Sequence, residues 1–252
     1  MSRTTTSRTP ASATQRWIGW GLAAVFGVAL AGCATVERTS ADAKRGVETH
    51  VTAPMRYRIH GADPMLRTNL DSAQAELAAG NHRGAITLLN RALWDVERIQ
   101  KRSLRLGELV VVYDALAQAY TAMGILDLAD EARRLSRSLS EAALREPSPG
   151  AIELLARARD AYVSAKFREA LGGLRQALVD LADIVDVETR ISSVAQTRCY
   201  LAFTYFATQD RSRVRDELRR LSAFDPSFDV CGRDAPPGVR ALIADLRRQN
   251  EL

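Results

Sequence analysis

The fold of this chain is decided by one stretch of its sequence, Tyr113-Asp-Ala-Leu116-Ala117-Gln-Ala-Tyr120-Thr-Ala-Met-Gly124-Ile-Leu-Asp-Leu-Ala129. Its apolar residues recur three or four positions apart as far as Tyr120, Gly124 interrupts the pattern, and Ala129 opens a second apolar period. This spacing is typical of one helix, a tight turn and a second helix antiparallel to the first. The stretch therefore predicts a helical hairpin.

The same pattern recurs along the chain. A second copy has Leu201-Ala202, Tyr205 and a closing Pro226, and two weaker copies keep only the small residues. The four copies align on Ala85, Ala129, Ala170 and Val214, at nearly even intervals. A repeat of this kind predicts an array of helical hairpins.

The hairpin resembles a tetratricopeptide (TPR) repeat. The family pattern has an aromatic residue, Leu-Gly and Tyr in the first helix, then Ala, an aromatic residue and Pro. Tyr113, Leu116-Ala117, Tyr120 and Ala129 match it, whereas Arg133 replaces the second aromatic residue. The intervals here exceed the family's roughly 34 residues, so we expect longer helices or connections. The resemblance implies an all-α solenoid that binds other proteins on its concave surface.

The hairpins are also part of a longer repeat, in which each unit contains two of them. A single shift of the sequence lays Ala85 on Ala170, Leu116-Ala117 on Leu201-Ala202 and Tyr120 on Tyr205 without a gap. The matches favour duplication of a four-helix block; the alternative is incidental identity between Ala- and Leu-rich helices. Gly172-Gly173 inside a helix further predicts a close helix contact there. We expect helices over 64–79, 82–102, 106–123, 126–145, 149–164, 167–184, 187–208 and 210–223, and a capping helix over 236–249.

The N-terminal residues have the pattern of a bacterial lipoprotein signal. Residues 1–16 carry three arginines and no acid, and residues 17–30 form an apolar run that is short for a membrane span. Leu30-Ala-Gly32-Cys33 then predicts cleavage between Gly32 and Cys33 and acylation of Cys33. The alternative is a free or buried cysteine that follows glycine by chance.

Two or three acyl chains on Cys33 would anchor the protein stably. By resemblance to enteric sorting rules, Ala34 favours the outer membrane and a protein that faces the periplasm. The predicted parts are a signal peptide at 1–32, a lipidated tether at 33–63, a first TPR-like four-helix block at 64–146, a second at 147–226, and a loop and capping helix at 227–252.

Composition and motifs argue against nucleic-acid binding and against enzymatic activity. Removal of the signal takes away three arginines and no acid, and the near-neutral balance that remains argues against nucleic acid as a partner. His50, His60 and His82 lack metal-site spacing, and no phosphate loop or catalytic motif is present. We therefore expect no enzyme, cofactor, metal or small-molecule substrate; an enzyme of unfamiliar type is the alternative.

Cys199 and Cys231 remain once Cys33 is lipidated. Antiparallel packing of the last helix pair would bring them close enough for a disulfide that pins the loop 224–235 to the array. The alternative is that Cys199 is a small apolar residue of a packed helix.

The resemblance to TPR arrays also implies a binding groove on the first helix of each pair. In the register of the family pattern, the groove-lining positions correspond to Arg67, Gln74, Asp114, Gln118, Arg159, Tyr162, Phe203 and Phe206. In the second block we expect Phe206 in the groove and Tyr205 in the core.

Two functions fit these features. One is a lipid-anchored protein-binding scaffold that assists assembly or stability of an envelope complex, of the pilus-secretin or outer-membrane assembly type. The other is an accessory regulatory subunit of a cell-wall or exopolysaccharide enzyme. The mature chain has a single tryptophan, Trp94, in a helix expected to pack, so protein binding is favoured over glycan binding.

Overall fold

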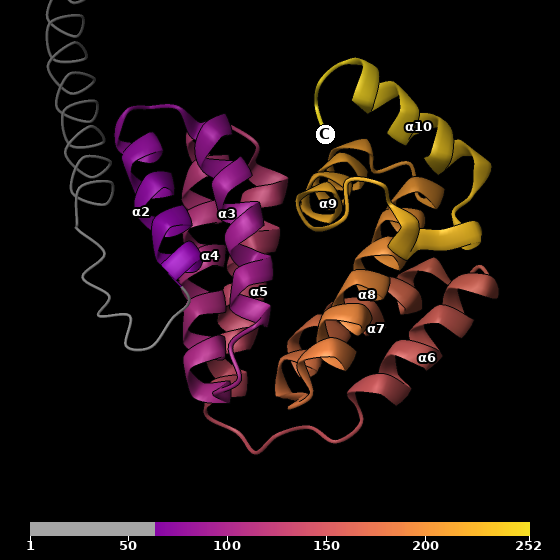
Figure 1. Ribbon diagram of the computed structural model, residues 1–252. Coiled ribbons are helices and arrows are strands. Elements are labelled where there is room, and N and C mark those ends of the chain that lie inside the picture. The colour runs from indigo at the N-terminus through magenta and orange to yellow at the C-terminus, as the bar shows by residue number, and fades with distance from the viewer. Residues whose placement is uncertain (1–63) are drawn as a thin grey trace, which may run out of the picture. The chain divides into compact units, whose positions relative to one another are not determined.

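A computed structural model describes residues 64–252 of the chain. Within this range all regular structure is helical, so the all-α class is confirmed, and four helix pairs followed by a C-terminal helix are consistent with the predicted α-solenoid (Figure 1). The α-helices are α2 (Pro64–Ala78), α3 (His82–Glu97), α4 (Arg102–Ala122), α5 (Leu126–Ala143), α6 (Ala151–Val163), α7 (Phe167–Asp180), α8 (Val187–Ala207), α9 (Arg211–Phe224) and α10 (Pro237–Arg248). Two 3₁₀ segments, η1 (Leu181–Asp183) and η2 (Asp229–Asp234), complete the described part.

The helix bounds differ from the expected ones mainly at two places. α3 ends before the expected position 102, at Glu97, and α4 begins at Arg102 instead of 106. The first turn of α4 looks exposed in the sequence because it contains charged residues, yet Arg105 is buried there. The second difference is η2, a short element in the loop after α9 that no periodicity in the sequence predicted.

The long repeat is visible in the backbone. We call α2–α5 block 1 and α6–α9 block 2. The last three helices of the two blocks begin at equivalent positions, namely 82 and 167, 102 and 187, and 126 and 211. The hairpin turns also match: Gly80 and Ala165 both have positive φ, as do Gly124 and Gln209. Block 2 keeps the left-handed turns although it lacks the glycines that favour them.

Each block has its own core of small and large apolar residues. The predicted close-packing alanines are buried, with Ala85 and Ala170 fully inaccessible, and Leu89 and Leu174 fill the space beside them. Gly173 faces α6 so closely that a Cβ atom would lie 2.9 Å from that of Ala158. The expected close contact is therefore present at Gly173 but not at Gly172, where a Cβ would meet nothing within 4 Å.

The two blocks pack reciprocally. α3 of block 1 contacts α9, and its counterpart α7 of block 2 contacts α5, which is the counterpart of α9. Figure 1 shows the blocks side by side, joined by the connector between α5 and α6. Two equivalent surfaces that contact each other in this way are related by a local two-fold axis.

Candidate functional site

A pair of buried arginines lies at the interface between block 1 and block 2, which we call the seam. Arg105 of α4 donates through Nε to the carbonyl oxygen of Ala182 in block 2 at 3.0 Å, and through Nη1 to that of Ile99 in its own block. Burial, together with the charge of Arg190, lowers the pKa of Arg105 to about 10. The guanidinium thus closes the C-terminal end of α3 and reaches across the seam.

Arg190 of α8, the counterpart of Arg105 in the repeat, makes the mirrored contacts. It donates through Nε to the carbonyl oxygen of Glu97 in block 1 at 3.0 Å, and through Nη1 to that of Ile184 in its own block. The acceptors are counterparts as well, since the repeat lays Glu97 on Ala182 and Ile99 on Ile184. Of the two arginines, only Arg190 forms an ion pair with a carboxylate, that of Glu97, because the residue at the Glu97 position of block 2 is an alanine.

Tyrosines extend this reciprocity along α4 and α8. Tyr120 donates to Asp216 of α9, and its counterpart Tyr205 donates to Glu131 of α5 at 3.5 Å. Arg198 donates to the hydroxyl of its own counterpart, Tyr113, at 2.8 Å. A residue that contacts its own counterpart lies at a two-fold axis, so the axis passes between the middles of α4 and α8.

The seam is not symmetric in every side chain. Trp94 of α3 donates to the carbonyl oxygen of Arg220 at 2.7 Å and stacks on Phe224, with ring centroids 4.4 Å apart. The corresponding position on α7 is Val179, and a small pocket lies beside it, lined also by Leu135 and Leu139. Trp94 therefore packs as expected. Its sequence position did not indicate that it would pack against the other block.

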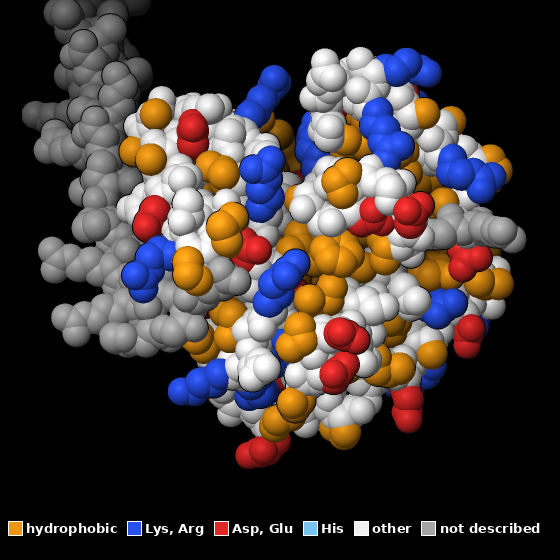
Figure 2. Space-filling view, in the orientation of Figure 1, with side chains coloured by type: hydrophobic (Ala, Val, Ile, Leu, Met, Phe, Trp, Pro, Cys, Tyr) orange, Lys and Arg blue, Asp and Glu red, His pale blue; other side chains and the backbone are white. Residues whose placement is uncertain are grey.

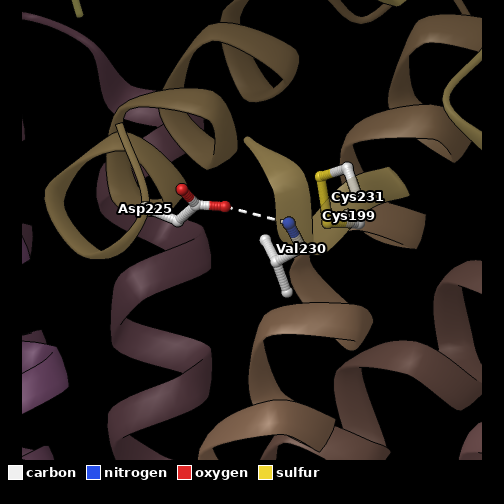
Figure 3. Close-up of a disulfide and its surroundings, with 4 residues drawn as sticks. All are labelled: Cys199, Asp225, Val230 and Cys231. Atoms are coloured by element: carbon white, nitrogen blue, oxygen red, sulfur yellow. Dashed lines mark hydrogen bonds between the residues drawn. A yellow bond between two sulfur atoms is a disulfide. The ribbon is translucent and has the colours of Figure 1, made fainter. Parts of the chain in front are cut away.

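The predicted groove of block 2 is covered by the chain itself. Phe203, assigned to the groove, is only 1% exposed, so that assignment is wrong. Cys199 forms a disulfide with Cys231, and the Asp225 carboxylate accepts a hydrogen bond from the backbone N–H of Val230 beside it at 2.9 Å (Figure 3). The C-terminal segment, residues 225–252, is thereby fixed against α8.

Other groove residues of block 2 are partly accessible. Phe206 is 37% exposed and lies against Gly238 of α10, where an added Cβ would meet its ring at 2.4 Å. Arg159 and Tyr162 are half-buried; the Arg159 guanidinium lies 5.0 Å from the ring centroid of Tyr200. Tyr205 is buried, as expected. The aromatic side chains of this face mainly pack on one another.

The groove residues of block 1 are more accessible. Arg67 and Gln74 of α2 and Gln118 of α4 are exposed, and Asp114 is half-buried. In block 2, by contrast, η2 and α10 pack on α8, the counterpart of α4. The structure thus places the groove residues of the two blocks in different environments.

Sequence reasoning overlooked the two arginines of the seam. The shift that lays Tyr120 on Tyr205 also lays Arg105 on Arg190, so the identity was a usable signal. Gly32, Cys33, His50 and His60 lie outside the described residues.

Residues 64–252 contain no group of His, Cys, Asp and Glu suited to a metal ion. The same residues include no helix with the length and apolarity of a membrane span. No protein-family model, curated protein or solved structure matches the chain. The functional interpretation therefore depends on the residues themselves.

Proposed function

We propose that this chain is a lipid-anchored scaffold of a bacterial envelope, and that it holds a partner protein on the first-helix face of block 1. The observation that carries the proposal is the contrast between the two faces. Block 2 has its face covered by residues 225–252, whereas Arg67, Gln74 and Gln118 of block 1 are accessible. Repeat arrays use such first-helix faces for binding.

The chemistry of the face defines the partner segment. Amide, guanidinium and carboxylate groups of Gln74, Gln118, Arg67 and Asp114 offer both donors and acceptors at spacings of one helical turn or more. An extended or helical segment with polar side chains can pair with these groups. The face is therefore proposed to hold a protein segment of an envelope complex, such as a secretin or an outer-membrane assembly factor.

The anchor and the compartment have separate support. Leu30-Ala-Gly32-Cys33 follows a basic and then an apolar segment, which is the order of a lipoprotein signal. The Cys199–Cys231 disulfide is typical of an oxidising compartment such as the periplasm. Together these features favour attachment at Cys33 with the array in the periplasm, and Ala34 favours the outer membrane.

In-cell photocrosslinking tests the binding face. A photoreactive residue at Gln118 should capture a specific envelope protein, identified by mass spectrometry, and one at Phe203, which is buried, should capture none. Capture of a secretin or barrel-assembly protein supports the scaffold, and capture of a glycosyltransferase or hydrolase supports an accessory subunit. Equal capture from both positions, or none from Gln118, contradicts the binding face.

The intact mass of the membrane-extracted protein tests the anchor. We expect a chain that begins at Cys33 and carries two or three acyl groups. In a Cys33→Ala variant neither the cleavage nor the acyl mass should appear. A wild-type chain without acyl groups would refute the anchor and leave the binding face to be judged by crosslinking alone.

A further inference from the structure

The outer face of α3 carries a row of exposed arginines. Arg83, Arg91 and Arg98 are exposed, and their spacings of eight and seven positions, close to two helical turns, keep them on one side of the helix and its C-cap. Figure 2 shows a row of blue side chains over α3. Among residues 64–252 none of these three guanidinium groups has a hydrogen-bond or ion-pair partner, and Lys101 follows in the next loop.

Elsewhere the protein pairs many of its arginines. Arg134 and Arg175 both bind Glu131, and Arg219 binds Glu251. Block 2 has no equivalent row, since the positions of Arg91 and Arg98 hold Gln176 and Asp183. The row is therefore a property of block 1 and not of the repeated fold.

We propose that this arginine face binds the anionic headgroups of a phospholipid bilayer and holds block 1 against the membrane. The alternative, an acidic protein, is disfavoured by what lies between the arginines. Protein interfaces depend on buried apolar or aromatic anchors, and α3 contributes no large exposed hydrophobic residue. A row of exposed guanidinium groups instead matches a surface of phosphates, which guanidinium groups bind well.

The position of α3 in the chain fits this surface. α3 packs on α2, and the two form the first described hairpin after residue 63, where the proposed lipidated tether ends. The inference uses the proposed anchor at Cys33 to bring block 1 near a membrane, but its headgroup chemistry does not depend on the anchor. Each basic side chain at an anionic surface strengthens binding about fivefold, so three should contribute roughly 100-fold.

Vesicle binding of the mature chain with Cys33→Ser, which has no acyl groups, tests the inference. Vesicles of equal parts phosphatidylcholine and phosphatidylglycerol should bind this chain, and vesicles of phosphatidylcholine alone should not. R83Q/R91Q/R98Q should lower partitioning about 100-fold. The matched control R157Q/R215Q/R240Q removes three other exposed arginines and should retain most of the binding.

Three results would overturn the proposal. They are equal loss in both triple variants, unchanged binding of R83Q/R91Q/R98Q, and binding to soluble polyglutamate without binding to the anionic vesicles. Added salt should weaken binding by the wild-type face, because exposed charges are screened. No partner protein or acyl chain is present in this assay, so its failure would leave the scaffold proposal intact.

Discussion

Block 1 and block 2 share their buried contacts and differ in their outer faces. Across the seam, Arg105 and Arg190 bind equivalent carbonyl groups, and Tyr120 and Tyr205 bind equivalent acids. On the outer face of α4 the sequence has Asp114, Gln118 and Thr121, where α8 has Cys199, Phe203 and Phe206. The interior therefore retains what joins the blocks, and the exterior has diverged.

This divergence explains why the C-terminal segment covers block 2 and not block 1. Aromatic side chains on α8 would expose a large apolar area to water, so burial under η2 and α10 stabilises them. In Figure 2 hydrophobic side chains gather over α8, next to this segment. The polar residues at the same positions of α4 need no cover. Block 2 is thus covered by residues 225–252, whereas Gln118 at the equivalent position of block 1 is exposed.

The largest expected effect tests whether the two seam arginines are equivalent. Arg190→Met should lower the free energy of unfolding by about 3–5 kcal/mol, because it leaves the buried Glu97 carboxylate without its partner. Arg105→Met loses carbonyl hydrogen bonds but leaves no carboxylate unpaired, so about 1–3 kcal/mol is expected. Urea denaturation of both variants measures the difference.

A double variant sharpens this comparison. Glu97→Gln combined with Arg190→Met should be more stable than Arg190→Met alone, since the unpaired charge is removed. If Arg105→Met were the more damaging substitution, the proposed asymmetry of the seam would be wrong.

The next effect concerns the closed face of block 2. Cys199→Ala/Cys231→Ala removes a disulfide between positions 32 apart in the sequence, which should lower the free energy of unfolding by about 3–4 kcal/mol. A reducing agent should have a similar effect on the wild type and none on the double variant. Protease cleavage between residues 225 and 236 should increase in the variant, while cleavage in block 1 should not. Unchanged proteolysis would show that the disulfide does not hold the cover in place.

A smaller effect compares the two seam tyrosines. Tyr120→Phe removes a donor from the fully buried Asp216 and should cost about 1–3 kcal/mol. Tyr205→Phe should cost less, because its hydrogen bond is longer and Glu131 retains both Arg134 and Arg175, whereas Asp216 retains Arg220. Thermal unfolding of both variants gives the order. Equal losses would mean that these additional arginines do not compensate for the hydroxyl.

The sequence predicted the helix pairs well, because apolar spacing and turn glycines record local structure directly. It could not predict which buried positions face the other block. A helical period shows that a residue such as Phe203 is apolar, but not that a later loop will cover it. The arginines of the seam were missed because charged residues near a helix start normally remain in water. Cys33 and the tether lie outside the described residues, so that part of the prediction stays open.

The smallest expected effect is a dependence on pH that Glu97 of block 1 supplies and its counterpart in block 2 does not. Burial raises the pKa of Glu97, against the opposing charges of Arg190, Arg105 and Arg198. Its Oε2 atom accepts no hydrogen bond from the described residues and lies 3.4 Å from Nε of Arg190. The corresponding residue of block 2 is Ala182, which does not titrate.

The sign of this pH dependence follows from the number of protons that the folded and the unfolded chain bind. Between the ordinary carboxyl pKa of 4.5 and the raised value, the folded protein binds more protons than the unfolded chain. Stability from this group therefore falls as the pH rises through that range and returns on acidification. The stability of the wild type relative to Glu97→Gln should increase from neutral pH toward pH 4.5, as measured by urea denaturation, whereas exposed Glu153→Gln should show no such trend. A wild type that loses stability relative to Glu97→Gln on acidification would mean that Arg190 and its neighbours outweigh burial, and the seam would then hold a stabilising ion pair on one side only.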